Sequence, residues 1–108
     1  MLYISKLFDM YRGPMVQNNK KVSTIFKALS DVNRLEILSL LKEGEKCACV
    51  LLEKMNMAQS TLSYHMKILS DSNLVESRQD GKWTHYKLSK AGSEYALSVL
   101  RAITTPKD

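Results

Sequence analysis

The fold is decided by residues 47–72, which read CACVLLEKMNMAQSTLSYHMKILSDS. Two stretches within it have helical periodicity, over about residues 47–55 and 59–72, and residues 56–58 between them form a three-residue turn. The second stretch turns leucines and a methionine to one side and small polar side chains to the other. A short helix, a tight turn and a polar-faced second helix predict a helix-turn-helix, which is typical of proteins that read the major groove of DNA.

The period changes on the C-terminal side of this stretch. Val75–Gln79 and Trp83–Leu88 are strand-like and are joined through Asp80-Gly81, a hairpin-turn signal. A basic hairpin in this place predicts a wing. Further helices are predicted over about residues 20–29, 33–43 and 90–103. The expected fold class is therefore mostly α with a small β-hairpin, a winged helix-turn-helix.

Capping signals support these helices. Ser30-Asp31 and Ser89 offer side-chain oxygens before the helices over 33–43 and 90–103, and Gly44 suits the C′ position of the first of these. In the last helix the apolar row is expected to be Ala91, Tyr95, Val99 and Ile103.

Length and composition exclude several classes of protein. A chain of 108 residues fits one compact domain, and 44% hydrophobic with 25% charged residues is typical of globular proteins. No apolar run approaches the length of a membrane span, and charged residues interrupt residues 1–16 where a signal peptide would need an apolar stretch. We therefore expect a cytoplasmic protein with no membrane partner.

The net charge of +5 lies mostly before the predicted domain. Residues 1–27 carry five basic side chains and one acidic one, whereas the other 81 residues carry eleven basic and ten acidic ones. Gly13-Pro14 breaks the local pattern. We predict an N-terminal arm or short helix over residues 1–19, the winged-helix and dimerisation domain over 20–104, and a tail over 105–108. The arm is interpreted as an auxiliary DNA-backbone contact or dimer extension, and the alternative is a variable extension.

The candidates for DNA contact lie on the second helix and on the hairpin. Gln, Ser, Thr and His side chains reach base edges in the major groove, and hydroxyls also bind phosphates. Basic residues flanking the hairpin tip suit a minor groove or the backbone. A merely solvated helix face is the alternative, and the turn and hairpin together favour DNA over it. The candidates are Gln59, Ser60, Thr61, Ser63, Tyr64, His65, Lys67, Arg78 and Lys82.

Cys47 and Cys49 are too few for a disulfide framework, and in a reducing compartment we expect thiols. Soft thiolates select thiophilic ions, and a helix N-terminus favours the thiolate. On a regular helix, residues i and i+2 point about 200° apart. Both sulfurs would then meet one ion only if the first turn were unwound, and this distortion would shift the adjoining recognition helix. Two small half-buried side chains are the alternative.

Two sulfurs leave the set of ligands incomplete. The two histidines, His65 and His85, are not expected near the cysteines, so a third donor would come from solvent, a small thiol or the other subunit. A thiol-redox sensor is the competing hypothesis. In it, oxidants modify Cys47 or Cys49 to a sulfenic acid or mixed disulfide, since an i, i+2 disulfide is geometrically strained.

From about Phe26 to Leu88 the chain resembles the ArsR/SmtB family of bacterial metal-responsive winged-helix repressors, and most of all its arsenical-resistance branch. The resemblance rests on FKALSD (26–31), NRLEIL (33–38), CAC (47–49), QSTLSYHMKIL (59–69) and GKWTHY (81–86). It implies a homodimer built from the first and last helices that binds an inverted-repeat operator without a cofactor. It also implies an inducer at Cys47 and Cys49, with As(III) or Sb(III) favoured and Cd(II) or Zn(II) as alternatives.

The chain departs from the family pattern at several positions. Val32 stands in place of the usual proline at a helix start. Ala58 replaces the Ser or Thr cap of the recognition helix, a loss worth about 1 kcal/mol that Ser60 partly offsets. Val50 and Leu52 stand where the family has an acidic residue and, in some members, a third cysteine. The last helix has no histidine, so we expect no zinc site there.

Other functional classes find little support. The chain has no nucleotide-binding loop, no paired carboxylates and no Ser-His-Asp set, and the cysteines lack the βαβ context of a thioredoxin-like motif, so we expect no enzyme. A winged helix used only for protein contacts is the remaining rival. It predicts no salt-dependent binding to a DNA duplex, whereas a DNA-binding protein weakens steeply as salt rises.

Overall fold

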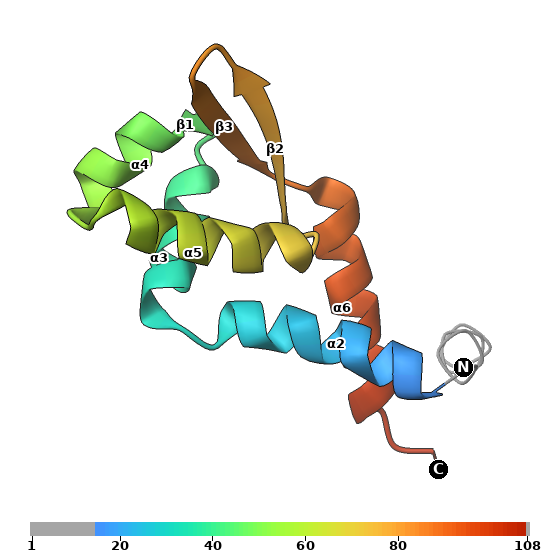
Figure 1. The fold of residues 1–108 in the computed structure, drawn as a ribbon. Helices are drawn as coiled ribbons and strands as arrows, with labels where there is room; N and C mark the ends of the chain where they lie inside the picture. The colour runs from blue at the N-terminus through green and yellow to red at the C-terminus, as the bar shows by residue number, and fades with distance from the viewer. Residues whose placement is uncertain (1–14, 108) are drawn as a thin grey trace.

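The structure is a computed structural model that describes residues 15–107 and confirms a winged helix-turn-helix (Figure 1). Residues 1–14 of the predicted arm lie outside these residues, and residues 15–19 belong to the first described helix. Across the described part of the chain, no helix is long and apolar enough to cross a membrane. The elements in chain order are α2 (Met15–Leu29), α3 (Val32–Leu41), β1 (Lys46–Cys47), α4 (Ala48–Met55), α5 (Gln59–Asp71), β2 (Val75–Asp80), β3 (Trp83–Leu88) and α6 (Lys90–Thr104).

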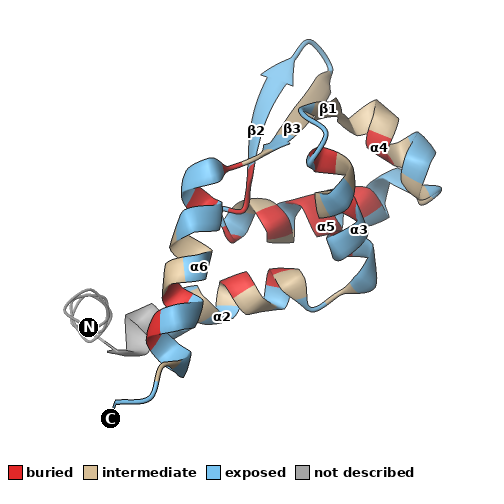
Figure 2. Ribbon diagram, turned by 180° about the vertical axis from the view of Figure 1, so that it is seen from behind, coloured by how far each residue is buried: buried red, intermediate tan, exposed pale blue. Residues whose placement is uncertain are grey.

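Helix α5 runs across the middle of the molecule, between the sheet and α2 (Figure 1). The inner side chains predicted for it, Leu62, Met66 and Leu69, are 2%, 1% and 0% exposed. Figure 2 shows the buried positions of the neighbouring helices facing inward around it. The core around α5 consists of Ala28, Ile37, Leu41, Leu51, Leu74 and Val75. The core therefore fixes one face of α5 and leaves the opposite face at the surface.

The sheet is antiparallel with the strand order β1-β3-β2. β2 and β3 form the predicted hairpin, with Val75 paired to Leu88 and Asp80 to Trp83. The turn is therefore Gly81-Lys82 and begins one residue later than expected, and Gly81 has a φ of +64°, which glycine adopts without strain. β1 was not predicted, because a strand of two residues is too short to show periodicity. It pairs with β3 and brings the cysteine segment onto the wing.

The capping predictions are confirmed for two helices. The carboxylate of Asp31 accepts hydrogen bonds from the backbone N–H groups of Asn33 (2.8 Å) and Arg34 (3.2 Å) at the start of α3. The bond from Arg34 is the main cause that holds the pKa of Asp31 below its ordinary value. Ser89 Oγ accepts from the N–H of Gly92 at 3.0 Å at the start of α6. Ala58 caps α5 with no side-chain hydrogen bond, and Ser60 does not substitute for it.

Three details of the helices differ from the sequence prediction. α2 begins at Met15 rather than about residue 20, so the helix continues through residues that the sequence pattern assigns to a loop. α3 ends with Lys42 as its C-cap, so Gly44, with a φ of +131°, lies one position beyond C′. In α6 the buried row is Gly92, Val99 and Ala102, whereas the predicted Ala91 and Ile103 are exposed.

Helix α6 approaches the turn between α5 and β2 very closely at Gly92. A Cβ atom added to Gly92 would lie 1.7 Å from the carbonyl oxygen of Asn73. The N–H of Ser89 donates to the carbonyl of Leu74 at 2.9 Å beside this contact. The start of α6 is thus docked backbone to backbone onto this turn, and only glycine fits there.

Candidate nucleic-acid interface and cysteine site

The helix-turn-helix consists of α4, a short turn and α5. Asn56 ends α4 in the left-handed conformation, with a φ of +51°, and its N–H donates to the carbonyl of Leu52 at 3.0 Å. Asparagine tolerates this conformation better than most residues. The chain reaches the start of α5 within two further residues. The turn predicted over residues 56–58 is therefore present, and it fixes α5 against α4.

The outer face of α5 is polar and exposed. Tyr64 is the largest side chain on it and is 58% exposed. Lys67 is also exposed and lies 3.3 Å from the carboxylate of Asp71 one turn later, so its charge stays at the surface. We call this surface the polar face; it consists of Gln59, Ser60, Thr61, Ser63, Tyr64 and Lys67. Hydroxyl, amide and ammonium groups in this arrangement suit base edges and phosphates.

The prediction that His65 belongs to the exposed face is wrong. His65 is only 5% exposed, and its Nδ1 lies 3.1 Å from Nη1 of Arg34, which is itself 5% exposed. A guanidinium has no acceptor, so Nδ1 of His65 is the acceptor of this bond. Positions 62, 65, 66 and 69 form one helical row, and this spacing from Leu62 is the signal that would have placed His65 inside.

Arg34 joins three helices inside the protein, a role that is not among the sequence predictions. Its Nε donates to the carbonyl of Ala28 at 3.1 Å and its Nη2 to the carbonyl of Lys27 at 2.9 Å, both at the end of α2. Its Nη1 bonds His65 on α5. The spacing of Arg34 from the buried Ile37 and Leu41 is the signal that would have found it. Arg34 therefore helps to set the position of α5 relative to α2 and α3.

Arg78 on the wing makes a tight ion pair with Glu45, which precedes β1. Nη2 of Arg78 lies 2.6 Å from Oε1 of Glu45, and Nε lies 2.9 Å and 3.2 Å from Oε1 and Oε2. These bonds lower the pKa of Glu45 and raise the pKa of Arg78. Arg78 is predicted from the sequence to contact a minor groove or the DNA backbone, and in this structure a carboxylate of the same chain binds its guanidinium. Lys82 is exposed at the hairpin turn.

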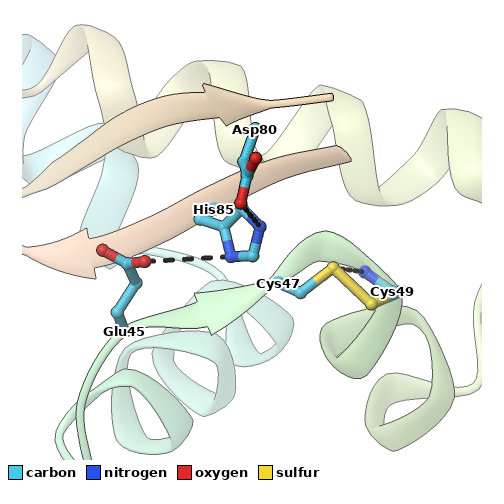
Figure 3. The surroundings of a disulfide bond; sticks show 5 residues. All are labelled: Glu45, Cys47, Cys49, Asp80 and His85. Atoms are coloured by element: carbon cyan, nitrogen blue, oxygen red, sulfur yellow. Dashed lines mark hydrogen bonds and ion pairs between the residues drawn. A yellow bond between two sulfur atoms is a disulfide. The ribbon is translucent and has the colours of Figure 1, made fainter. Parts of the chain in front are cut away.

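Cys47 and Cys49, the cysteine pair, are joined by a disulfide bond, whereas the sequence predicted thiols (Figure 3). Cys47 is the N-cap of α4, with an extended backbone at a φ of −67° and a ψ of 145°. Its Sγ accepts from the N–H of Cys49 at 3.1 Å, and the two Cα atoms are 5.1 Å apart. The angle expected for two helical residues does not apply, because Cys47 lies outside the helix. Both sulfurs meet without unwinding of α4.

His85 lies on β3 directly opposite Cys47, so the prediction that no histidine lies nearby is wrong (Figure 3). The pairing of β1 with β3 produces this neighbourhood, and β1 had no sequence signal. The ring stands between two carboxylates, with Nδ1 3.8 Å from Glu45 and Nε2 3.9 Å from Asp80. Within residues 15–107, no three Cys, His, Asp or Glu side chains are grouped so as to hold a metal ion.

The last helix exposes an apolar surface away from the cysteine pair. Leu97, Leu100 and Ile103 of α6 are 54%, 43% and 49% exposed. These positions follow helical spacing, so they lie along one side of α6. An exposed apolar row of this kind is typical of a helix that packs against another protein surface.

Comparison with known proteins agrees with this architecture. A sequence model of a family described as "Bacterial regulatory protein, arsR family" matches residues 31–77. The arsenical resistance operon repressor of Staphylococcus aureus is 50% identical over 86 residues, which are 80% of this chain and 83% of that repressor.

Two solved structures have the same fold. Reduced HlyU from Vibrio cholerae N16961 superimposes with a TM-score of 0.63 at 27% identity, covering 85% of this chain and 97% of the HlyU chain. A homodimeric winged helix-turn-helix DNA-binding domain from Mycobacterium bovis superimposes with a TM-score of 0.69 at 24% identity, covering 89% of this chain and 90% of that domain.

Proposed function

Because this chain belongs to the ArsR family of bacterial regulatory proteins, and is a DNA-binding transcriptional regulator rather than an enzyme, we propose the following function. The protein represses transcription by binding operator DNA as a homodimer. It leaves the operator when a thiophilic ion, As(III) or Sb(III), binds the reduced Cys47 and Cys49.

The polar face of α5 is the observation that carries this proposal. Its inner row is packed into the core, so the helix is held rigidly while hydroxyl, amide and ammonium groups project outward. A rigid helix with such groups is what direct reading of base edges needs. The wing beside it supplies Lys82 for the backbone. We assign Gln59, Thr61, Ser63 and Tyr64 to base edges or phosphates, and Lys67 to a phosphate.

The homodimer is supported by the apolar row of α6. Leu97, Leu100 and Ile103 are about half exposed in the described part of the chain, and a second copy of α6 would bury them further. The Mycobacterium bovis domain of the same fold is homodimeric. Two copies related by a two-fold axis would present two recognition helices to an inverted-repeat operator.

The inducer site is supported by the position of the cysteine pair. Cys47 and Cys49 stand at the N-terminus of α4, where the backbone N–H groups and the helix dipole favour thiolates. Thiolates select soft ions, and the Staphylococcus aureus relative is an arsenical resistance repressor. Because Cys47 is extended, the ion needs no unwinding of α4. It acts instead on β1 and on the start of α4. The end of α4 is joined to α5 by the short turn.

The test is a titration of the reduced full-length protein bound to a labelled fragment of its own upstream promoter. Arsenite and antimonite are each added, with Cd(II) and Zn(II) in parallel. Release at micromolar arsenite or antimonite supports the proposal. Release by Cd(II) or Zn(II) alone would replace the metalloid with a divalent ion, and no binding to the fragment would refute the repressor itself.

Removing two hydroxyls from the polar face is expected to weaken operator binding. The double variant Thr61→Ala with Ser63→Ala loses two contacts of roughly 1 kcal/mol each, so the Kd rises by about tenfold or more. Fluorescence anisotropy at fixed salt measures it, and circular dichroism checks the fold. The matched control, Ser39→Ala with Ser93→Ala, removes two exposed hydroxyls from α3 and α6. Equal Kd values for the two double variants would refute the recognition face.

Cys47→Ser is expected to keep operator binding and to lose release by arsenite. A serine oxygen caps a helix well, so α4 keeps its start, while the site retains one sulfur. Promoter release is measured over a range of arsenite concentrations. The control Ala48→Ser adds a hydroxyl between the two cysteines and keeps both sulfurs. A Cys47→Ser protein that no longer binds DNA would show a structural role, and one that still responds to arsenite would place the inducer elsewhere.

The disulfide favours a second candidate function, a thiol-redox sensor at the same pair. Hydrogen peroxide would take two electrons from the two thiols, which form one S–S bond while the peroxide is reduced to two waters. This product differs from the mixed disulfide or sulfenic acid that the sequence favoured, because the extended Cys47 brings the sulfurs together. Operator release by peroxide and never by arsenite would establish this function in place of the first.

A further inference from the structure

We propose that Glu45 competes with a DNA phosphate for the guanidinium of Arg78. This competition lowers the affinity of the wing for DNA. This inference rests on the proposed operator binding. It concerns the wing, and it assigns to Glu45 a role in setting affinity.

The contact between the two side chains joins distant parts of the sequence. Arg78 lies in β2, whereas Glu45 lies in the loop between α3 and β1, 33 residues earlier. Three distances of 2.6 Å, 2.9 Å and 3.2 Å connect Nη2 and Nε of Arg78 to the two carboxylate oxygens. The ion pair is therefore bidentate, and the carboxylate of Glu45 occupies the edge of the guanidinium formed by Nε and Nη2.

A phosphate would use the same edge. Arginine binds carboxylate and phosphate alike through pairs of parallel N–H groups, and one pair cannot serve both acceptors at full strength. The remaining nitrogen, Nη1, lies 3.8 Å from the carboxylate of Asp80, so it too faces an acid. Arg78 is 56% exposed at its side chain, so a phosphate has access to it once Glu45 withdraws.

The surroundings keep Glu45 charged and in place. His85 on β3 lies between the two acids, with Nδ1 3.8 Å from Glu45. The pKa of Glu45 is lowered, chiefly by the hydrogen bonds from Arg78, so the carboxylate is ionised at neutral pH. Glu45 is also two residues before Cys47, so the acid that holds Arg78 and the cysteine pair lie on one short stretch of chain.

If Glu45 is a competitor, Glu45→Gln changes the operator affinity in one direction, and if Glu45 is a structural brace, the same variant changes it in the other. If Glu45 merely braced the wing for DNA, then Glu45→Gln would weaken operator binding. If Glu45 competes with phosphate, the same change frees Arg78 for one further phosphate contact. One added contact increases the magnitude of the slope of log K against log salt concentration by about 0.9.

The experiment compares five full-length proteins on the promoter fragment over a salt series: wild type, Glu45→Gln, Arg78→Gln, the double variant of these two, and Glu76→Gln. Glu45→Gln is expected to bind about twofold to fivefold tighter at fixed salt, the range of a strong exposed ion pair, with a slope steeper by about one contact. In the Arg78→Gln background, the second change is expected to produce no steeper slope. Glu76→Gln is the matched control, because it removes one negative charge from β2, the strand of Arg78, at a residue that forms no ion pair with Arg78.

The outcomes separate this inference from the proposed function. Tighter binding and a steeper slope that both depend on Arg78 establish the competition. Weaker or unchanged binding by Glu45→Gln, or a gain equal to that of Glu76→Gln, overturns it while wild-type binding still supports the repressor. Wild-type protein that fails to bind the fragment overturns the proposed function first.

Discussion

Gly92→Ala is expected to destabilise the protein by about 3 kcal/mol, the upper part of the range for an overpacked contact. A Cβ at this position would lie 1.7 Å from the carbonyl oxygen and 2.7 Å from the carbonyl carbon of Asn73. Both atoms belong to the backbone of a turn in which Asn73 has a φ of +64°, so neither moves away alone. The start of α6 has to shift, and its cap at Ser89 shifts with it.

The direction of the expected change in unfolding free energy distinguishes the close contact at Gly92 from the ordinary effect of the substitution. Glycine to alanine in a helix ordinarily stabilises by up to about 1 kcal/mol, so the expected loss opposes the intrinsic preference. Urea unfolding at one protomer concentration measures it, since association changes apparent stability. Ser93→Ala is the neighbouring control at an exposed position in the same turn. A Gly92→Ala protein as stable as this control would contradict the close docking of α6.

Arg34→Met is expected to lower the free energy of unfolding by about 3 to 5 kcal/mol. It is also expected to abolish operator binding at protein concentrations that saturate the operator with wild type. Methionine fills the space of the aliphatic stem but donates no hydrogen bond. The carbonyl of Ala28 and the Nδ1 of His65 would then lose the donor that now binds them, and the carbonyl of Lys27 would keep only its bonds from Ser30. Without these hydrogen bonds α5 is no longer linked to the end of α2, so the orientation of the polar face is no longer fixed.

Arg101→Met supplies the comparison, because Arg101 is exposed on α6 and the same chemistry is removed there at the surface. Its urea midpoint and Kd are expected to stay near those of the wild type. If Arg34→Met unfolds at the same urea concentration as Arg101→Met, the buried network does not stabilise the fold. If it unfolds early but binds the operator normally, Arg34 stabilises the protein without positioning α5.

Much of the fold was predictable because strong local patterns agree with the tertiary structure. The inner row of α5, the hairpin and the caps at Asp31 and Ser89 each have a signal within a few residues. The polar face followed from the same periodicity. The polar side chain of His65 favours an exposed position, whereas its spacing from Leu62 places it in the buried row, and the structure follows the spacing.

The cysteine site was less predictable because it depends on contacts between distant segments. Cys47 was interpreted as helical, and pairing with β3 in fact holds it extended as the cap of α4. The neighbours His85 and Arg78 reach the cysteine segment only through the sheet order β1-β3-β2. No pattern within ten residues of Cys47 indicates either neighbour.

The shortness of β1 has a consequence for motion. A strand of two residues at a sheet edge is held by few backbone hydrogen bonds, so it opens at a small fraction of the free energy of global unfolding. The amide of Cys47 should therefore exchange with solvent deuterium much faster than the amides of α5. The segment that contains Cys47 is thus able to detach from the sheet and return while the hydrophobic core remains intact.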